Sequence, residues 1–211
     1  MAKTTPTKAL VLVDIQNDFL LGGALAVPDG DAVIPVALAL IASFEVVVAT
    51  QDYHPANHGS FASQHGAEPY IMGELGGHPQ VLWPDHCVQG TPGVAFPDDL
   101  PMDRIDAVFP KGMDRRVDSY SGFFDNDQGQ PTGLGRWLRT RGIEEVTIVG
   151  LATDYCVKAT ALDALNEGFG VTLVLDGCRA VKPEDGDAAI AEMEDAGVEF
   201  TTLAAFTATH A

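Results

Sequence analysis

The sequence predicts an α/β protein with three αβα layers, in which helices cover both faces of a mostly parallel, roughly six-stranded sheet. Short, nearly continuous apolar runs recur along the chain, as expected for strands that are buried on both faces. Stretches with helical periodicity lie between these runs, and repeated strand–helix–strand units favour a parallel sheet with crossover connections. Because 46% of the 211 residues are apolar, the chain can bury a substantial core.

The elements follow one another as short strands and longer helices. The strands are expected at Ala9–Val13, Glu45–Thr50, Ile105–Phe109, Val146–Gly150 and Val171–Leu175, with a weaker last strand at Glu199–Leu203. The helices are expected at Ala32–Ser43, Leu134–Arg141, Tyr155–Glu167 and Asp185–Ala196. Gly142 and Gly168 follow two of these helices, where glycine is a favoured residue for ending a helix.

One stretch, 51–103, breaks this alternation, because it is rich in Gly, Pro and His and shows little periodicity. A loop of that length inside a compact domain is usually functional. We therefore expect a single domain over residues 1–211, with an irregular insertion at about 51–103 that lies over the active face. A dinucleotide cofactor is not expected, because Leu138 stands where a third glycine would have to follow Gly133 and Gly135.

Charge and cysteine content limit the possible partners and the compartment. The chain carries 12 Lys and Arg against 30 Asp and Glu, a formal net charge of −18, which disfavours nucleic acid and anionic membranes as partners. Its three cysteines are too few and too far apart for a disulfide framework. The N-terminal residues precede no apolar run long enough for a signal peptide or membrane span. We therefore expect a cytoplasmic protein.

Ionisable side chains gather where four of the expected strands end. Asp14 ends the first strand, Asp52 and His54 follow the second, Lys111 follows the third, and Cys156 follows the fourth. In an open parallel sheet, ligands bind at the carboxyl ends of the strands. These side chains are therefore expected to share one site.

Cys156 is the candidate nucleophile of this site. The start of a helix and a neighbouring Lys111 would both favour its thiolate, and Asp14 could accept and return a proton. The alternative, a buried structural thiol, is equally expected from the local sequence around Cys156. For Cys87 and Cys178, the structural interpretation is favoured.

Two further groups of residues could serve a ligand. Asp52 and His54 lie two residues apart on one face of an extended segment, and His86 could add a third metal ligand from the insertion. Two imidazoles and one carboxylate suit Zn, Fe or Mn with positions left open. His58 is a weaker candidate. The third group consists of aromatic residues that could wall a slot for a flat ring, namely Phe19, Trp83 and Tyr120.

Several motifs of the chain occur together and in a fixed order. They are Leu12–Phe19 (LVDIQNDF), Thr50–His58 (TQDYHPANH), Trp83–Thr91 (WPDHCVQGT) and Gly150–Val157 (GLATDYCV), with Phe109–Gly112 and Tyr120–Phe123 in agreement. Taken together, these motifs resemble the nicotinamidases of the isochorismatase-like hydrolase superfamily, and the likeness extends from about the first strand to the last. The Asp-x-His and Trp-Pro-x-His elements separate the nicotinamidases from metal-free relatives.

The resemblance implies the isochorismatase-like hydrolase fold and the hydrolysis of nicotinamide to nicotinate and ammonia, in NAD salvage, through a cysteine thioester. It also implies one divalent metal ion, zinc before iron or manganese, that binds the pyridine nitrogen. The expected partner is nicotinamide or a pyrazinamide-like analogue, and the chain is expected to be a monomer or a homodimer. A cis peptide is implied before Thr153. The implied roles are catalytic for Asp14, Lys111 and Cys156, oxyanion-binding for Ala152 and Cys156, substrate-binding for Phe19, Trp83 and Tyr120, and metal-binding for Asp52, His54 and His86.

Two alternatives stay open at this point. Another amidase of the superfamily could act on a carbamoyl or ureido compound through Asp14, Lys111 and Cys156, and it would not need the metal-type residues. A non-catalytic metal-binding or ligand-binding protein could also keep the same scaffold.

Overall fold

The computed structural model of the chain describes residues 7–210. The prediction that no signal peptide or membrane span follows the N-terminal residues concerns in part Met1–Pro6, which lie outside this range. Ala211 also lies outside it. Within residues 7–210, no helix combines the length and the apolar character that crossing a membrane would require.

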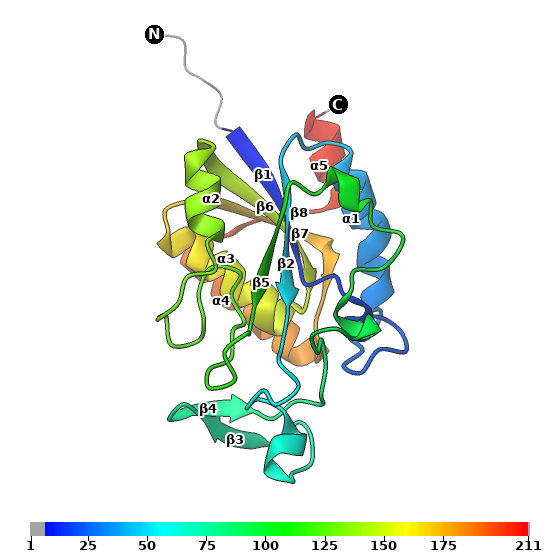
Figure 1. Ribbon diagram of the computed structural model, residues 1–211. Helices are drawn as coiled ribbons and strands as arrows, with labels where there is room; N and C mark the ends of the chain where they lie inside the picture. Colours follow the sequence, from blue (N-terminus) through cyan, green and yellow to red (C-terminus); the bar gives the residue numbers. More distant parts are fainter. Residues whose placement is uncertain (1–6, 211) are drawn as a thin grey trace.

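The main sheet has six strands, all parallel to their neighbours, in the order β5-β2-β1-β6-β7-β8 (Figure 1). Five of the strands lie where apolar runs predicted them, because each is covered on both faces. Their bounds are Thr7–Val13 for β1, Val47–Asp52 for β2, Ala107–Lys111 for β5, Ile143–Leu151 for β6, Gly170–Arg179 for β7 and Glu199–Thr201 for β8.

Helices cover both faces of this sheet, so the three-layer αβα prediction is confirmed. Helices α1 and α5 lie on one side in Figure 1, and α2, α3 and α4 lie on the other. The helix bounds are Val33–Ile41 for α1, Leu134–Thr140 for α2, Lys158–Asn166 for α3, Pro183–Ala196 for α4 and Leu203–His210 for α5.

The central strand β1 contributes side chains to the apolar cores on both faces of the sheet. Successive side chains of a strand point to opposite faces of the sheet. Leu10 and Leu12 therefore pack in the core beneath α1, whereas Ala9, Val11 and Val13 pack in the core beneath α2, α3 and α4. All five are fully buried.

The strand order creates a ligand-binding position at the carboxyl edge of the sheet. The chain passes from β1 outward to β2 and β5, then returns to β6 on the other side of β1. Such a reversal opens a crevice between the two central strands, and ligands in open α/β sheets bind there. Asp14 follows β1 and Cys156 follows β6, so these two residues lie on either side of the reversal.

The segment between β2 and β5 extends beyond the carboxyl end of β2 (Figure 1). Its regular part is a hairpin of β3 (Met72–Leu75) and β4 (His78–Val81), with short 3₁₀ turns elsewhere. The sequence expectations did not include this hairpin.

The structure also differs from the expectations at the end of the chain. The last strand stops at Thr201, and the chain continues into α5 instead of ending as a strand. Phe206 of α5 stacks on Phe44, with ring centroids 5.5 Å apart, so α5 covers an end of the apolar layer beneath α1.

Candidate active site

The Lys111 ammonium group lies at the centre of a buried polar cluster. Lys111 is the last residue of β5, and its Nζ lies 2.9 Å from Asp14 Oδ2 and 2.5 Å from Asp52 Oδ1. The same nitrogen donates hydrogen bonds to the Ser119 carbonyl at 2.8 Å and to Cys156 Sγ at 3.4 Å. The structure thus brings Asp14, Lys111 and Cys156 together.

The charges in this cluster stabilise one another. Burial works against the ammonium form of Lys111, but Asp14 and Asp52 more than offset it and raise its pKa well above the ordinary value. Burial also opposes the charge on Asp52, yet Lys111 and His54 hold the pKa of this carboxyl well below its ordinary range. For Asp14 burial prevails, and its pKa is raised. Asp14 is therefore the more easily protonated of the two carboxylates.

The surroundings of Cys156 favour the protonated thiol, whereas the sequence predicted a thiolate. Burial raises its pKa well above the value of a free thiol, Lys111 offsets only part of this effect, and Asp14 and Asp52 add to it. Cys156 therefore keeps its proton until a nearby base removes it. One oxygen from each of the two carboxylates lies within 4.8 Å of its sulfur.

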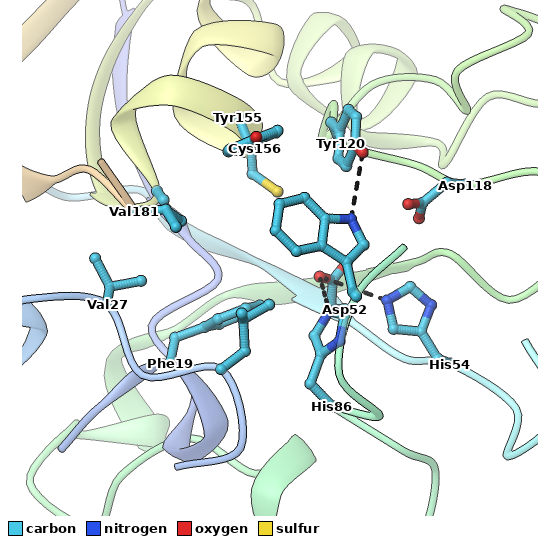
Figure 2. A pocket seen from close by; sticks show the side chains of 13 residues that line it. Phe19, Val27, Asp52, His54, His86, Asp118, Tyr120, Tyr155, Cys156 and Val181 are labelled. Atoms are coloured by element: carbon cyan, nitrogen blue, oxygen red, sulfur yellow. Dashed lines mark hydrogen bonds and ion pairs between the residues drawn. The ribbon is translucent and has the colours of Figure 1, made fainter. Parts of the chain in front are cut away.

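A π-helical turn positions Cys156 in front of the pocket. Residues Thr153–Val157 form this turn between β6 and α3, where the sequence predicted an α-helix from residue 155. The cis peptide lies between Leu151 and Ala152, one residue earlier than the resemblance implied. Single π-helical turns are often found at functional sites, since the extra residue redirects a side chain. Figure 2 shows the Cys156 sulfur pointing into the pocket from this turn.

Asp52, His54 and His86 form a compact metal-type group. Asp52 Oδ2 lies 3.6 Å from His54 Nε2 and 3.7 Å from His86 Nε2, close to the roughly 3.3 Å between two ligands of a tetrahedral zinc ion. His54 Nδ1 and His86 Nδ1 each lie 2.8 Å from a backbone carbonyl oxygen. A carbonyl only accepts, so each Nδ1 donates its proton, and Nε2, which faces the carboxylate, is the nitrogen that could bind an ion in place of a proton. This donor set fits one divalent cation.

Gly112 provides one of these carbonyl groups and allows close approach. Its φ is +64°, and a Cβ at this position would lie 2.3 Å from His54 Cε1. Only glycine adopts this conformation without a steric penalty and leaves space for the imidazole ring. The orientation of His54 therefore depends on the residue after β5.

His58 lies beside the metal-type group, but both of its ring nitrogens have other partners. Its ring centroid is 4.3 Å from that of His54. Nε2 lies 3.3 Å from the Val117 carbonyl and must donate to it, while Nδ1 accepts from the Ser60 hydroxyl at 2.7 Å. In this arrangement the one lone pair of the neutral His58 ring is used in a hydrogen bond, although a ligand atom of His58 also lies within 4.8 Å of one from His54 and one from Asp118.

The pocket in front of Cys156 has one polar end and largely aromatic walls. It has an empty volume of about 390 Å³, including the part open to solvent. Phe19, Trp83 and Tyr120 all line it, as the sequence predicted. Trp83 Nε1 donates to Tyr120 Oη at 3.3 Å, and burial raises the pKa of Tyr120, so its hydroxyl stays protonated. Asp52, His54 and His86 lie at the polar end (Figure 2).

Sequence reasoning missed several residues of the site. Tyr155 packs edge-on against Trp83, with ring centroids 4.9 Å apart, and Val27 and Val181 lie on the wall beside Phe19 (Figure 2). Tyr155 precedes Cys156 in the chain, so its position next to the candidate nucleophile was the one available signal. Val181 lies in the loop after β7. The Asp154 carboxylate accepts hydrogen bonds from the backbone N–H groups of residues 181 and 182 and so fixes the position of this loop.

The fold and the site together define a hydrolase class. The isochorismatase domain family matches residues 8–205, which is nearly the whole chain. The chain belongs to the isochorismatase family.

Within that family, five relatives that share 34% to 55% identity with this chain over 82% to 94% of its length are nicotinamidases. The nicotinamidase of Escherichia coli K12 is 55% identical over 94% of this chain and 96% of its own length. A solved nicotinamidase/pyrazinamidase from Acinetobacter baumannii has a TM-score of 0.91 and 43% identity, with 96% of this chain and 99% of that chain covered. By contrast, the similarity to a ureidoacrylate amidohydrolase covers only 37% of this chain. The chain belongs to the nicotinamidase group of the family.

Two further solved structures carry ligands. One, from L. infantum, is in complex with nicotinate; it has a TM-score of 0.84 and 38% identity, and covers 96% of both chains. The other is the pyrazinamidase of Pyrococcus horikoshii in complex with zinc, with a TM-score of 0.78, 41% identity, and coverage of 93% of this chain and 99% of that chain.

Proposed function

We propose that this protein hydrolyses nicotinamide to nicotinate and ammonia through a thioester on Cys156, and that it does so in NAD salvage. The observation that carries the proposal is the shared pocket, onto which the Cys156 thiol and a three-ligand metal-type group both open. The identity of 55% to a nicotinamidase over nearly the whole chain supports the same substrate.

We infer that Asp52, His54 and His86 hold the metal ion. Zinc is the preferred ion, because two imidazoles and a carboxylate are typical zinc ligands and a similar pyrazinamidase was solved with zinc. When bound, the ion supplies an open coordination position for the pyridine nitrogen, which orients the carboxamide.

The aromatic walls and the backbone complete the binding site. Phe19, Trp83 and Tyr120 are proposed to hold the flat pyridine ring between them, since all three line the pocket. The backbone N–H groups of Ala152 and Cys156 are proposed to bind the oxyanion that forms on the carboxamide oxygen.

Three side chains carry the proton and covalent chemistry. As the Cys156 sulfur attacks the carboxamide carbon, its proton passes to Asp14. The C–N bond then breaks, Asp14 returns the proton to the leaving nitrogen, and ammonia departs from the thioester. A water molecule next loses a proton to Asp14 and attacks the thioester carbon, which releases nicotinate and reprotonates Cys156. Lys111 holds Asp14 and the sulfur in place and keeps the charge of the cluster balanced.

The test is ammonia release from nicotinamide, with metal content measured on the same sample. The Cys156→Ala variant is expected to lose activity by at least about 1,000-fold, because the nucleophile is gone. Cys178→Ala is the matched control, since Cys178 is equally buried and lies outside the pocket lining. Undiminished turnover by Cys156→Ala would refute the thioester, and an inactive parent protein with bound metal would favour a binding protein on this scaffold.

A further inference from the structure

The two carboxylate oxygens of Asp14 have different surroundings. Oδ1 accepts a hydrogen bond from the Thr50 hydroxyl at 2.6 Å. Oδ2 is fully buried, receives no hydrogen bond from a neutral donor among residues 7–210, and pairs with the Lys111 ammonium group. An oxygen held by a charge alone keeps acceptor capacity for a proton, which suggests a functional role.

The direction of the Thr50 hydrogen bond is fixed by a second contact. Thr50 Oγ1 accepts the backbone N–H of Asp14 at 3.2 Å. A hydroxyl group has one proton, and here its oxygen already faces an N–H donor, so that proton points to Asp14 Oδ1. Thr50 is fully buried in β2, which keeps water from competing for either group.

Lys111 forms an ion pair with Oδ2, and its Nζ lies 2.9 Å from that oxygen. The same ammonium group also faces three other acceptors, namely Asp52 Oδ1, the Ser119 carbonyl and Cys156 Sγ. Oδ2 thus lies beside the positive charge that also contacts the Cys156 sulfur, whereas Oδ1 is occupied by the Thr50 hydroxyl.

We propose that Thr50 is a positioning residue of the reaction, which reserves Asp14 Oδ2 as the proton carrier by donating to Oδ1. In the first step, the S–H bond of Cys156 breaks, an S–C bond forms to the carboxamide carbon, and the proton moves to Oδ2. In the second step, the C–N bond breaks and the same proton moves from Oδ2 to the nitrogen, which leaves as ammonia. Without the Thr50 hydroxyl, Asp14 can turn either oxygen toward the thiol or away from it.

This inference rests on the proposed nicotinamide hydrolysis, and a pair of variants tests it separately. Thr50→Val keeps the shape of the side chain and removes the hydroxyl, whereas Thr50→Ser keeps the hydroxyl. Thr50→Val is expected to lower kcat by about 10- to 100-fold, part of what a positioned base contributes, with KM within about threefold of the parent value. Thr50→Ser is expected to restore kcat to within about threefold of the parent, because it retains the donor.

A second readout needs no amide substrate, so it separates failure of the inference from failure of the proposed function. The rate of Cys156 alkylation by iodoacetamide uses the same proton acceptor and is expected to fall in Thr50→Val and recover in Thr50→Ser. Thr147→Val, a buried threonine of β6 away from the pocket, is the matched control and is expected to behave as the parent. Should Thr50→Val not fold, Thr50→Ala takes its place with the same criteria.

The outcomes differ clearly. Parental kcat and alkylation rates in Thr50→Val would overturn the inference. Equal losses in Thr50→Val and Thr50→Ser, with a higher KM or a lower metal content, would show that Thr50 only packs the sheet and would also overturn it. A parent protein that releases no ammonia while alkylation follows the expected order would refute the proposed function and leave the positioning of Asp14 supported.

Discussion

At the scale of single residues, Lys111 connects the two halves of the site. Asp52 turns one oxygen to Lys111 and the other to the two imidazoles, so the same carboxylate serves the ammonium group and the metal-type group. The sequence could place Lys111, Asp14 and Asp52 at one sheet edge, because each follows an apolar strand. It could not predict Ser119 or Thr50, since a backbone carbonyl and a mid-strand hydroxyl carry no sequence pattern of their own.

The thiol of Cys156 gives a prediction at this scale. In metal-free protein, its alkylation by iodoacetamide is expected to rise with pH and to reach its midpoint above the roughly 8.5 of a free thiol. Burial penalises the thiolate more than Lys111 favours it, so the pKa is raised and the thiol stays protonated at neutral pH. The pH profile of alkylation, followed by mass spectrometry of the Cys156 peptide, checks this. A plateau reached below pH 7 would contradict it.

At the scale of elements, prediction succeeded where one physical effect dominates. Strands β1, β2 and β6 are buried on both faces, so each consists of a nearly continuous apolar run that the sequence shows directly. Their bounds agree with the predicted bounds to within a few residues. The π-helical turn at Thr153–Val157 could not be predicted, because it depends on packing around Cys156 and not on a local preference. The hairpin β3–β4 was missed for a different reason: its strands are only four residues each, and only one of the eight residues is buried, so the apolar and polar residues show no strand pattern in the sequence.

The loop after β5 gives a prediction at the element scale. Gly112→Ala is expected to lower metal content and activity by at least about 10-fold, because the added Cβ would meet the His54 ring and move a ligand. Gly66→Ala is the matched control, since Gly66 also has a positive φ, +59°, but has nothing within 4 Å of a Cβ. Both variants are expected to lose about 1 kcal/mol of stability from the backbone conformation, measured by denaturant unfolding. Metal content that falls equally in both, or in neither, would contradict the role of Gly112.

At the scale of the whole molecule, the site depends on the order of the strands in the sheet, which the apolar runs of the sequence do not predict. The strands and the reactive residues at their carboxyl ends could be predicted from the chain, but the strand order could not. The position of β1 between β2 and β6 is what brings Asp14 between Lys111 and Cys156. The motif resemblance supplied this missing information, because long motifs in a fixed order imply a known fold. His86 reaches the site only because the segment after β2 folds back over the sheet edge.

This arrangement predicts that the metal ion stabilises the connection between the sheet and the segment 53–88. Asp52 belongs to β2, whereas His86 comes from the far end of that segment, so one ion would join the two. An ion at about 100 times its Kd adds about 2.7 kcal/mol to the free energy of unfolding, which corresponds to a Tm shift of roughly 5–10 °C at this size. Chelation is therefore expected to lower Tm by about that amount and to speed amide exchange in residues 53–88 more than in β1. In His86→Ala, which lacks one ligand, the chelator is expected to have little further effect. An unchanged Tm after verified removal of the metal would show that Asp52, His54 and His86 keep their positions without an ion, and the contribution of the metal would then be confined to the substrate.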